Sequence, residues 1–189
     1  NTDAYYRNGT IPFVRIEDTE NKYINSVKTF ITEEGLRHSS AWLVPSNSVI
    51  FTNGATVGNV AINRIPVATK QGILGIIPNK AVTTEYLYYL LSAGFFQREV
   101  RNRQATGTFA TIILKNLNEI DVCIPDKWEQ RKISDYLSSI DNLITLHQRK
   151  YEKLVNIKKA LLEKMFPQGD EKVPRIRFKG FTEAWEQRK

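Results

Sequence analysis

The chain has 189 residues, 41% of them hydrophobic and 11% aromatic, which is enough for one domain with a buried core and an appendage. Its single cysteine, Cys123, excludes an internal disulfide, and two histidines with one cysteine exclude a zinc site of the usual ligand spacing. No apolar run reaches the roughly 18 residues of a membrane span and no charged, apolar leader is seen, so we expect a cytoplasmic protein.

The net charge of +7 is unevenly divided along the chain. Residues 1–125 carry 12 Lys and Arg against 10 Asp and Glu, whereas residues 126–189 carry 15 against 10. Nucleic acid is attracted to concentrated positive charge, so the nearly balanced first part argues against a protein that coats DNA indiscriminately. Any contact of that part with DNA is expected to be local.

The first part of the chain has the composition of short strands separated by polar turns. β-Branched and aromatic residues predict strands at Ile11–Ile16, Val27–Ile31, Ala41–Val44, Val49–Thr52, Val60–Ile62 and Ile73–Ile77. Glu34-Gly35 and Asn53-Gly54 are among the turn signals between them. We therefore expect a twisted, mostly antiparallel sheet.

Helical periodicity begins after this sheet. Thr84 is suited to cap one helix, and a second helix is expected from Phe95 to about Arg103. A last strand is expected at Ile120–Ile124, where Cys123 would be a buried structural thiol. Together these segments predict an α+β domain over residues 1–125.

A long helix is predicted from Asp126 to Phe166, since Asp126 can cap it and Pro167 ends it. Its apolar positions recur in alternating steps of four and three, a heptad seam that favours pairing with a second helix. The seam consists of Ile133, Leu137, Ile140, Ile144, His147, Tyr151, Leu154, Leu161 and Met165, with Lys158 in the remaining position. The alternative is an ordinary amphipathic helix lying on its own domain, because Tyr136, Leu143 and Ile157 widen the stripe.

Catalytic signatures are sparse in this sequence. It contains neither a G-x-x-x-x-G-K-[ST] phosphate loop nor G-x-G-x-x-G. The best nuclease-like group is Asp18, Glu20 and Lys22, whose carboxylates could hold a divalent ion beside a lysine but which is more typical of an exposed turn. A stand-alone Mg²⁺-dependent nuclease therefore remains an alternative function, and we predict no metal site.

Polar residues suited to reading DNA are better represented. A glycine-rich loop around Asn53 and a basic, hydroxyl-rich stretch after Arg98 offer amides for adenine and cations for guanine and phosphate. The candidate DNA-binding residues are Lys28, Arg37, Asn53, Thr56, Asn59, Lys70, Gln71, Arg98, Arg101, Arg103, Gln104, Thr106 and Thr108. Each group alone is equally well explained as a solvated loop or helix face.

Several short motifs along the chain carry a family resemblance. The more specific ones lie in the helical half: Ile124-Pro125, Glu129-Gln130, Lys132-Ile133, Leu146-His147-Gln148-Arg149-Lys150, Leu161 to Pro167, and Arg177-Phe178 through Trp185. Looser ones in the first part are Gly9 to Phe13, Ser48 to Gly58, Ala68 to Gln71 and Leu87 to Leu90. With these motifs the chain resembles the DNA specificity subunits of type I restriction-modification systems, and its first part resembles their target recognition domain.

This resemblance implies a non-catalytic subunit without a cofactor, which directs methyltransferase and endonuclease subunits to a bipartite site on double-stranded DNA. The methyltransferase partner would use S-adenosylmethionine. Residues 1–125 would be the recognition domain, 126–166 the pairing and spacing helix, and 167–189 a linker towards a following repeat. Full-length members carry two such halves whose helices pack antiparallel, so the resemblance implies a half subunit or fragment.

Trp128-Glu-Gln-Arg-Lys132 recurs as Trp185-Glu-Gln-Arg-Lys189, which fits one half followed by the opening of another. A lone half would leave its helix seam unpaired, so we expect a twofold homodimer. A protein-only coiled-coil adaptor that binds no DNA is the remaining alternative.

Overall fold

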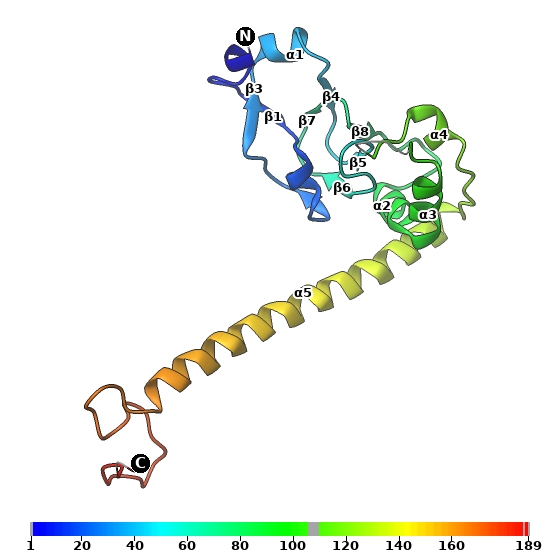
Figure 1. Ribbon diagram of the computed structural model, residues 1–189. Coiled ribbons are helices and arrows are strands. Elements are labelled where there is room, and N and C mark those ends of the chain that lie inside the picture. The colour runs from blue at the N-terminus through cyan, green and yellow to red at the C-terminus, as the bar shows by residue number, and fades with distance from the viewer. Residues whose placement is uncertain (1, 106–109, 187, 189) are drawn as a thin grey trace. The chain divides into compact units, whose positions relative to one another are not determined.

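The computed structural model describes residues 2–105, 110–186 and 188 (Figure 1). The chain forms two compact units, Asn1–Asp135 and Tyr136–Lys189. Within the described residues, no helix combines the length and apolar character needed to cross a bilayer.

The first unit contains two four-stranded sheets. The first sheet has the order β3-β1-β7-β4, with β1 Ile11–Phe13, β3 Thr29–Ile31, β4 Trp42–Val44 and β7 Val67–Thr69. The second has the order β2-β6-β5-β8, with β2 Tyr23–Ile24, β5 Val49–Thr52, β6 Val60–Asn63 and β8 Ile73–Ile76. Of the six pairings between these described strands, β1–β7 and β2–β6 are parallel and the other four are antiparallel. The expected α+β class with mostly antiparallel pairing is confirmed.

Strand β5 lies at the centre of the core because both of its faces are buried. Successive side chains of a strand point to opposite faces. Ile50 accordingly packs in a cluster shared with the first sheet, whereas Val49 and Phe51 pack in a second cluster against helices, and all three side chains are 0% exposed.

The short helices of the first unit surround this core. They are η1 Thr2–Tyr5, η2 Ile16–Thr19, α1 Glu33–Arg37, α2 Thr84–Ser92, α3 Gly94–Asn102 and α4 Leu114–Asn118. Leu91 of α2 and Phe96 of α3 complete the second cluster, and Phe51 meets Phe96 edge-to-face at 6.3 Å between ring centroids. Figure 1 shows α2 and α3 beside β5 and β6.

Two predictions around α2 and the last strand were wrong in detail. The helix begins at Thr84, so Thr83 rather than Thr84 occupies the cap position. Residues 120–124 are not a strand, because a strand needs a neighbour and no described strand pairs with this segment. Only Ile120 reaches the core; Cys123 is exposed rather than buried.

The predicted long helix is present as α5, Lys127–Lys164. Its 38 residues correspond to a length of about 57 Å at 1.5 Å per residue. At its start, the Asp126 carboxylate accepts hydrogen bonds from the backbone N–H groups of Trp128 (2.8 Å) and Glu129 (3.0 Å), as a capping residue does.

The second unit consists of α5 from Tyr136 onward and a tail that turns back on the helix end. The Ile176 N–H donates to the Lys164 carbonyl at 2.9 Å, and the Trp185 N–H donates to the Lys172 carbonyl at 2.8 Å. The rings of Phe166 and Trp185 meet edge-to-face at 5.9 Å.

Candidate nucleic-acid interface

Two glycines bring the loop between β5 and β6 into contact with the turn between β7 and β8. The N–H groups of Asn53 and Gly54 both donate to the Gly72 carbonyl, at 3.0 and 3.2 Å. A side chain at Gly54 would approach the Gly72 Cα to 3.1 Å, and Gly72 has φ +93°, which favours glycine. The loop that contains Thr56 is thereby held against the turn that contains Lys70 and Gln71.

A third segment joins the same place from far along the chain. Thr111 forms isolated β-bridges with Gly54 and with Ala105. The Ile112 N–H donates to the Asn53 carbonyl at 3.0 Å, and the Asn53 side-chain amide donates to the Ile112 carbonyl at 3.0 Å. Residues 53–58, 70–72 and the described parts of 101–111 therefore lie together, and we call them the three-segment edge.

Helix α3 is attached beside this edge through Gln97. The Gln97 amide donates to the Gly58 carbonyl at 2.9 Å and to the Leu91 carbonyl at 2.7 Å. This attachment orients α3 so that Val100 is buried while Arg98 and Arg101 are exposed. Two predicted cationic residues are thus carried on a helix that is fixed to the edge.

The exposed groups of the edge suit a nucleic acid. Thr56, Lys70 and Gln71 are exposed at its two loops, and Arg98 and Arg101 are exposed on α3. Arginine and lysine can neutralise phosphates, whereas Gln and Arg can make paired hydrogen bonds to base edges in the major groove. The fold therefore joins two polar clusters that are separate in the sequence, since Gln71 of the first and Arg98 of the second are 27 positions apart.

Other predicted residues serve the domain itself. The Asn59 amide donates to the Thr19 hydroxyl at 3.2 Å, and its N–H donates to the Thr52 hydroxyl at 2.9 Å. Arg103, which directly follows α3, forms an ion pair with Glu99 of that helix, and its carbonyl accepts from Asn116 at 3.1 Å. Like the Asn53 amide, these groups form bonds within the domain. They stabilise the shape of the edge and are less available to bind a ligand.

The remaining candidates lie elsewhere or are only partly accessible. Gln104 is half-buried at the end of the α3 segment. Lys28 precedes β3, and Arg37 ends α1, where it lies 3.9 Å from Glu33. Figure 1 shows α1 and β3 at the end of the first unit opposite α3 and α4. Thr106 and Thr108 lie outside the described residues.

The nuclease-like residues have separate local roles. The Asp18 carboxylate accepts from the Arg15 N–H at 2.8 Å across η2, and the Lys22 ammonium donates to the Tyr89 hydroxyl. Across residues 2–105, 110–186 and 188, no three His, Cys, Asp or Glu side chains gather as metal ligands would. Nothing in this geometry favours the nuclease alternative.

Sequence reasoning missed a cation–aromatic cluster beside β2. The Lys22 ammonium lies 4.3 Å from the Tyr89 ring centroid, and the Arg64 guanidinium lies 4.4 Å from that of Tyr23. Arg64 also donates to the Asn47 side chain at 2.8 Å. The basic and aromatic residues are far apart in sequence, so only the fold reveals that these cations are held within the domain.

Gln130, in the first turn of α5, was recognised only as part of a family motif. Its side chain is 0% exposed; the amide donates to the carbonyls of Ala81 and Pro125, each at 2.9 Å, and the oxygen accepts from the Thr83 N–H at 2.9 Å. The Ser134 hydroxyl donates to the Gln130 carbonyl at 2.7 Å. This residue ties the start of α5 to the loop before α2.

The side chain of Tyr86 in α2 lies in the same part of the first unit. Burial, followed by the negative charges of Glu129 and Cys123, raises its pKa above the ordinary 10.0. The phenol therefore stays protonated to a higher pH than the phenol of an exposed tyrosine.

The heptad seam of α5 is largely exposed in the second unit. Ile140, Ile144, His147, Tyr151, Leu154 and Leu161 are exposed, as is Lys158, while Leu137 and Met165 are half-buried; Ile133, in the first unit, is also half-buried. A row of large apolar side chains left in water at helical spacing is typical of a surface made for a partner.

Comparison with known proteins identifies the family. Residues 1–156 match the family model for the type I restriction modification DNA specificity domain, and the chain belongs to this family. It is 32% identical to the type I restriction enzyme MjaIX specificity subunit of Methanocaldococcus jannaschii, over 85% of this chain and 38% of that protein. It is 26% identical to the EcoR124I/EcoR124II specificity subunit of Escherichia coli, over 80% of this chain and 41% of that protein.

Solved structures agree on the fold. A chain from a structure of a type I restriction-modification system aligns with a TM-score of 0.64 at 18% identity, over 86% of this chain and 40% of that one. The HsdS subunit from Thermoanaerobacter tengcongensis aligns with a TM-score of 0.62 at 18% identity, over 88% and 40%. The present chain thus spans about two-fifths of the length of the curated relatives and structures that it matches.

Proposed function

We propose that this chain reads one half of a bipartite DNA site on behalf of a type I restriction-modification complex. Its three-segment edge, with Arg98 and Arg101 on the adjoining helix, would contact the bases and phosphates. Two sets of supporting facts are independent: family membership, and a fold that gathers cationic and amide side chains from distant segments at one edge. A protein that reads chromosomal DNA would work in the cytoplasm.

In this proposal the chain performs no chemistry of its own. Methyltransferase subunits, using S-adenosylmethionine, would modify the site, and an endonuclease subunit would join through the complex. The Asp18 and Lys22 side chains, which a nuclease would need free for a metal and a substrate, are engaged with Arg15 and Tyr89.

The division of labour along the chain follows from the same proposal. Residues 1–125 would recognise DNA, residues 126–166 would pair and set spacing, and residues 167–189 would lead towards a following repeat. The exposed seam of α5 supports a pairing role, and a second copy of this chain would supply the matching helix.

Co-expression of the chain with its cognate methyltransferase subunit, followed by mapping of methylated genomic sites, tests the proposal. A single recurrent bipartite motif is expected, and a symmetric motif is expected if two copies pair. Methylation without a shared motif would contradict sequence reading. Mg²⁺-dependent cutting by the isolated chain, lost in Asp18→Ala, would instead establish the nuclease, and absence of any DNA binding would favour the adaptor.

A further inference from the structure

A one-residue break separates α3 from the helix before it. Helix α2 ends at Ser92 and α3 begins at Gly94, and the residue between them, Ala93, has the extended backbone angles φ −64° and ψ 142°. An extended residue interrupts the helical path, so α3 does not continue the axis of α2. Contacts elsewhere in the domain must therefore fix the orientation of α3 and of the arginines on it.

Glycine at position 94 gives this break additional freedom. Among the described residues, no atom lies within 4 Å of the place where a Cβ at Gly94 would be, so close packing does not explain the glycine. Glycine also restricts the backbone less than any other residue type. The break between α2 and α3 therefore has the properties of a hinge.

Apolar contacts hold α3 against the domain without fixing its rotation. Phe96 and Val100 are 4% and 1% exposed and belong to the second core cluster. They are four positions apart and so lie on one face of the helix. Hydrophobic attraction is non-directional, so this face alone constrains rotation of α3 about its own axis only weakly.

The Gln97 side chain supplies the directional contact. Its amide donates to the Leu91 carbonyl in the last turn of α2 and to the Gly58 carbonyl in the loop between β5 and β6. The carbonyls of a last helical turn have no partner within their own helix, so Leu91 gains one here. The loop comes so close that a Cβ on Gly58 would collide with the Gln97 Oε1 atom. One amide thus joins α2, α3 and the three-segment edge.

Gln97 lies on the same flank of α3 as Arg101. Successive residues of a helix are about 100° apart, so positions 97 and 101 are one turn apart and neighbouring, whereas Arg98 lies opposite the buried face. Both arginines are exposed. The Gln97 hydrogen bonds therefore constrain Arg101 more directly than Arg98.

We propose that Gln97 is a positioning residue for DNA reading, which acts without contacting DNA by holding Arg101 where it discriminates among base pairs. This rests on the proposed function of the three-segment edge. A binding side chain must be held within about 0.5 Å of its productive geometry by supporting hydrogen bonds. A displaced arginine loses paired hydrogen bonds to a base but still attracts phosphates. Loss of Gln97 therefore relaxes the choice of site more than it lowers total methylation.

The substitution Gln97→Met tests this role in the full 189-residue chain, co-expressed with its cognate methyltransferase subunit. Methionine keeps the length of the side chain and removes both donors. Methylation is compared between the motif mapped for the wild-type chain and its single-base variants. The preference should fall about tenfold at the base pairs that Arg101→Ala also affects, and at no others. Unchanged preferences, or an equal loss on all sequences, would overturn the proposal.

The double variant Gln97→Met with Arg101→Ala shows whether Gln97 acts through the arginine. If it does, the double variant should have the base preferences of Arg101→Ala alone. Two losses that multiply would show independent effects and would contradict the proposal. Unaltered preferences in Arg101→Ala would contradict it too, because Gln97 would then have no base-reading residue to position.

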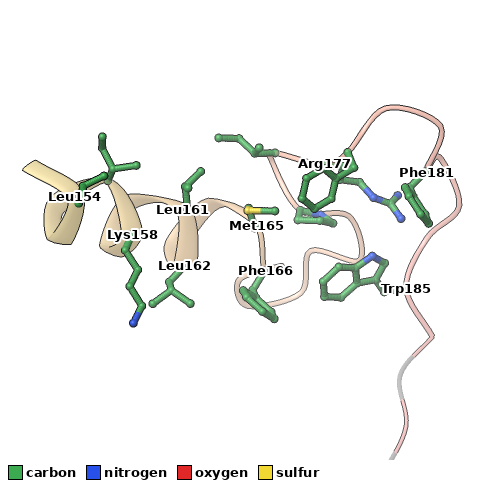
Figure 2. Close-up of a pocket in the computed structure, with 13 residues that line it drawn as sticks. Leu154, Lys158, Leu161, Leu162, Met165, Phe166, Arg177, Phe181 and Trp185 are labelled. Atoms are coloured by element: carbon green, nitrogen blue, oxygen red, sulfur yellow. The ribbon is translucent and has the colours of Figure 1, made fainter.

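Gln168→Met is the matched control. Gln168 lies in the tail just after Phe166 (Figure 2), and its amide donates to the Glu163 carbonyl at 3.1 Å. The control removes the same kind of bond outside the first unit and should leave every base preference unchanged. Relaxation at the same base pairs in Gln168→Met would show that the effect does not arise at Gln97.

Hydrogen exchange without DNA separates this inference from the proposed function. The Gly58 amide donates to the Thr52 carbonyl at 2.9 Å and should exchange about tenfold faster in Gln97→Met, because its loop loses the bond to α3. The Ile62 amide of the second sheet should keep its protection if the domain remains folded.

The two readouts together give distinct outcomes. If the wild-type chain methylates one motif while Gly58 exchange or the base preferences do not respond to Gln97→Met, the positioning role is wrong and DNA reading stands. If Gly58 exchange responds but the wild-type chain yields no motif, the proposed function fails, and Gln97 only stabilises the domain.

Discussion

The two units of this protein treat their apolar side chains in opposite ways. In the first, Val49, Ile50 and Phe51 of β5 are 0% exposed, buried between the first sheet on one face and helices α2 and α3 on the other. In the second, Tyr151 is 69% exposed and Leu154 is 55% exposed although both lie on a regular apolar seam. The first unit completes its core alone, whereas the second presents half of one.

This contrast would allow one chain to combine the proposed reading of DNA with the proposed pairing. A self-contained core fixes the loops of the three-segment edge, and fixed loops can discriminate among DNA sequences. An exposed seam contributes little stability to its own chain but gives a large apolar area to a complex. Substitutions in the two regions should therefore have separable consequences.

The largest expected effect is the loss of a core ring. Phe51→Ala removes the ring that packs against Phe96 and should destabilise the first unit by about 3–5 kcal/mol, because the cavity adds to the lost burial. Chemical denaturation followed by circular dichroism measures this change. Tyr151→Ala is the matched control on the seam and should change the free energy of unfolding by less than about 0.5 kcal/mol at concentrations where the chain is monomeric. Equal losses of unfolding free energy in the two variants would contradict the difference proposed between the two units.

The next effect concerns the polar joint at Gln130. Gln130→Met keeps the volume but leaves the Thr83 N–H and the Ala81 and Pro125 carbonyls without their buried partner, which should cost about 2–4 kcal/mol locally. Hydrogen exchange of the Thr83 amide should accelerate strongly. The Ile62 amide, which donates to the Lys22 carbonyl at 2.7 Å within the second sheet, should keep its protection as the internal control. Retained protection at Thr83 would mean that the joint is not held by Gln130.

A charge on the seam should affect association without affecting the first unit. Leu154→Glu or Ile140→Glu would place a carboxylate in an apolar helix pair and weaken self-association at least about a hundredfold, roughly 2.7 kcal/mol. Asn156→Glu introduces the same charge on the opposite face of α5 and should leave association unchanged. Sedimentation measures both. A dimer that persists in Leu154→Glu would argue that the seam is not the interface.

The elements that could be predicted from the sequence also differ between the two units. The seam of α5 repeats over ten positions, so periodicity alone predicted that helix. Strands β5 and β6 were also recognised, because consecutive β-branched residues mark a buried strand. Strands β2 and β7 were not predicted, and β2 has only two residues, too few to show a period.

Tertiary contacts account for the other differences. Gly35 signalled a turn but lies inside α1, where a Cβ would come within 2.9 Å of Tyr5, so close packing rather than a turn explains the glycine. The meeting of Gly54 with Thr111 joins residues that no local pattern relates. The candidate residues were therefore predictable by type, but their assembly into one edge was not, and neither was the internal use of the Asn53 and Asn59 amides.

The smallest expected effect is also the most specific to DNA reading. Arg101→Ala or Gln71→Ala should weaken binding or relax the choice of site by about 1–3 kcal/mol if the side chain meets a base edge, with no change in folding because both residues are exposed. Mapping of methylated sites with the cognate methyltransferase measures the choice. Arg175→Ala removes the same charge from the tail, where Arg175 pairs with Glu171 at 3.4 Å, and should leave the methylated motif intact.

A phosphate contact would instead lower affinity for all sequences alike and reduce the salt dependence of binding, so the methylated motif separates a base-reading residue from one that only holds the backbone. Unaltered methylation and binding in both variants would remove Arg101 and Gln71 from the interface, and would shift attention to Lys70 and Arg98 on the same edge.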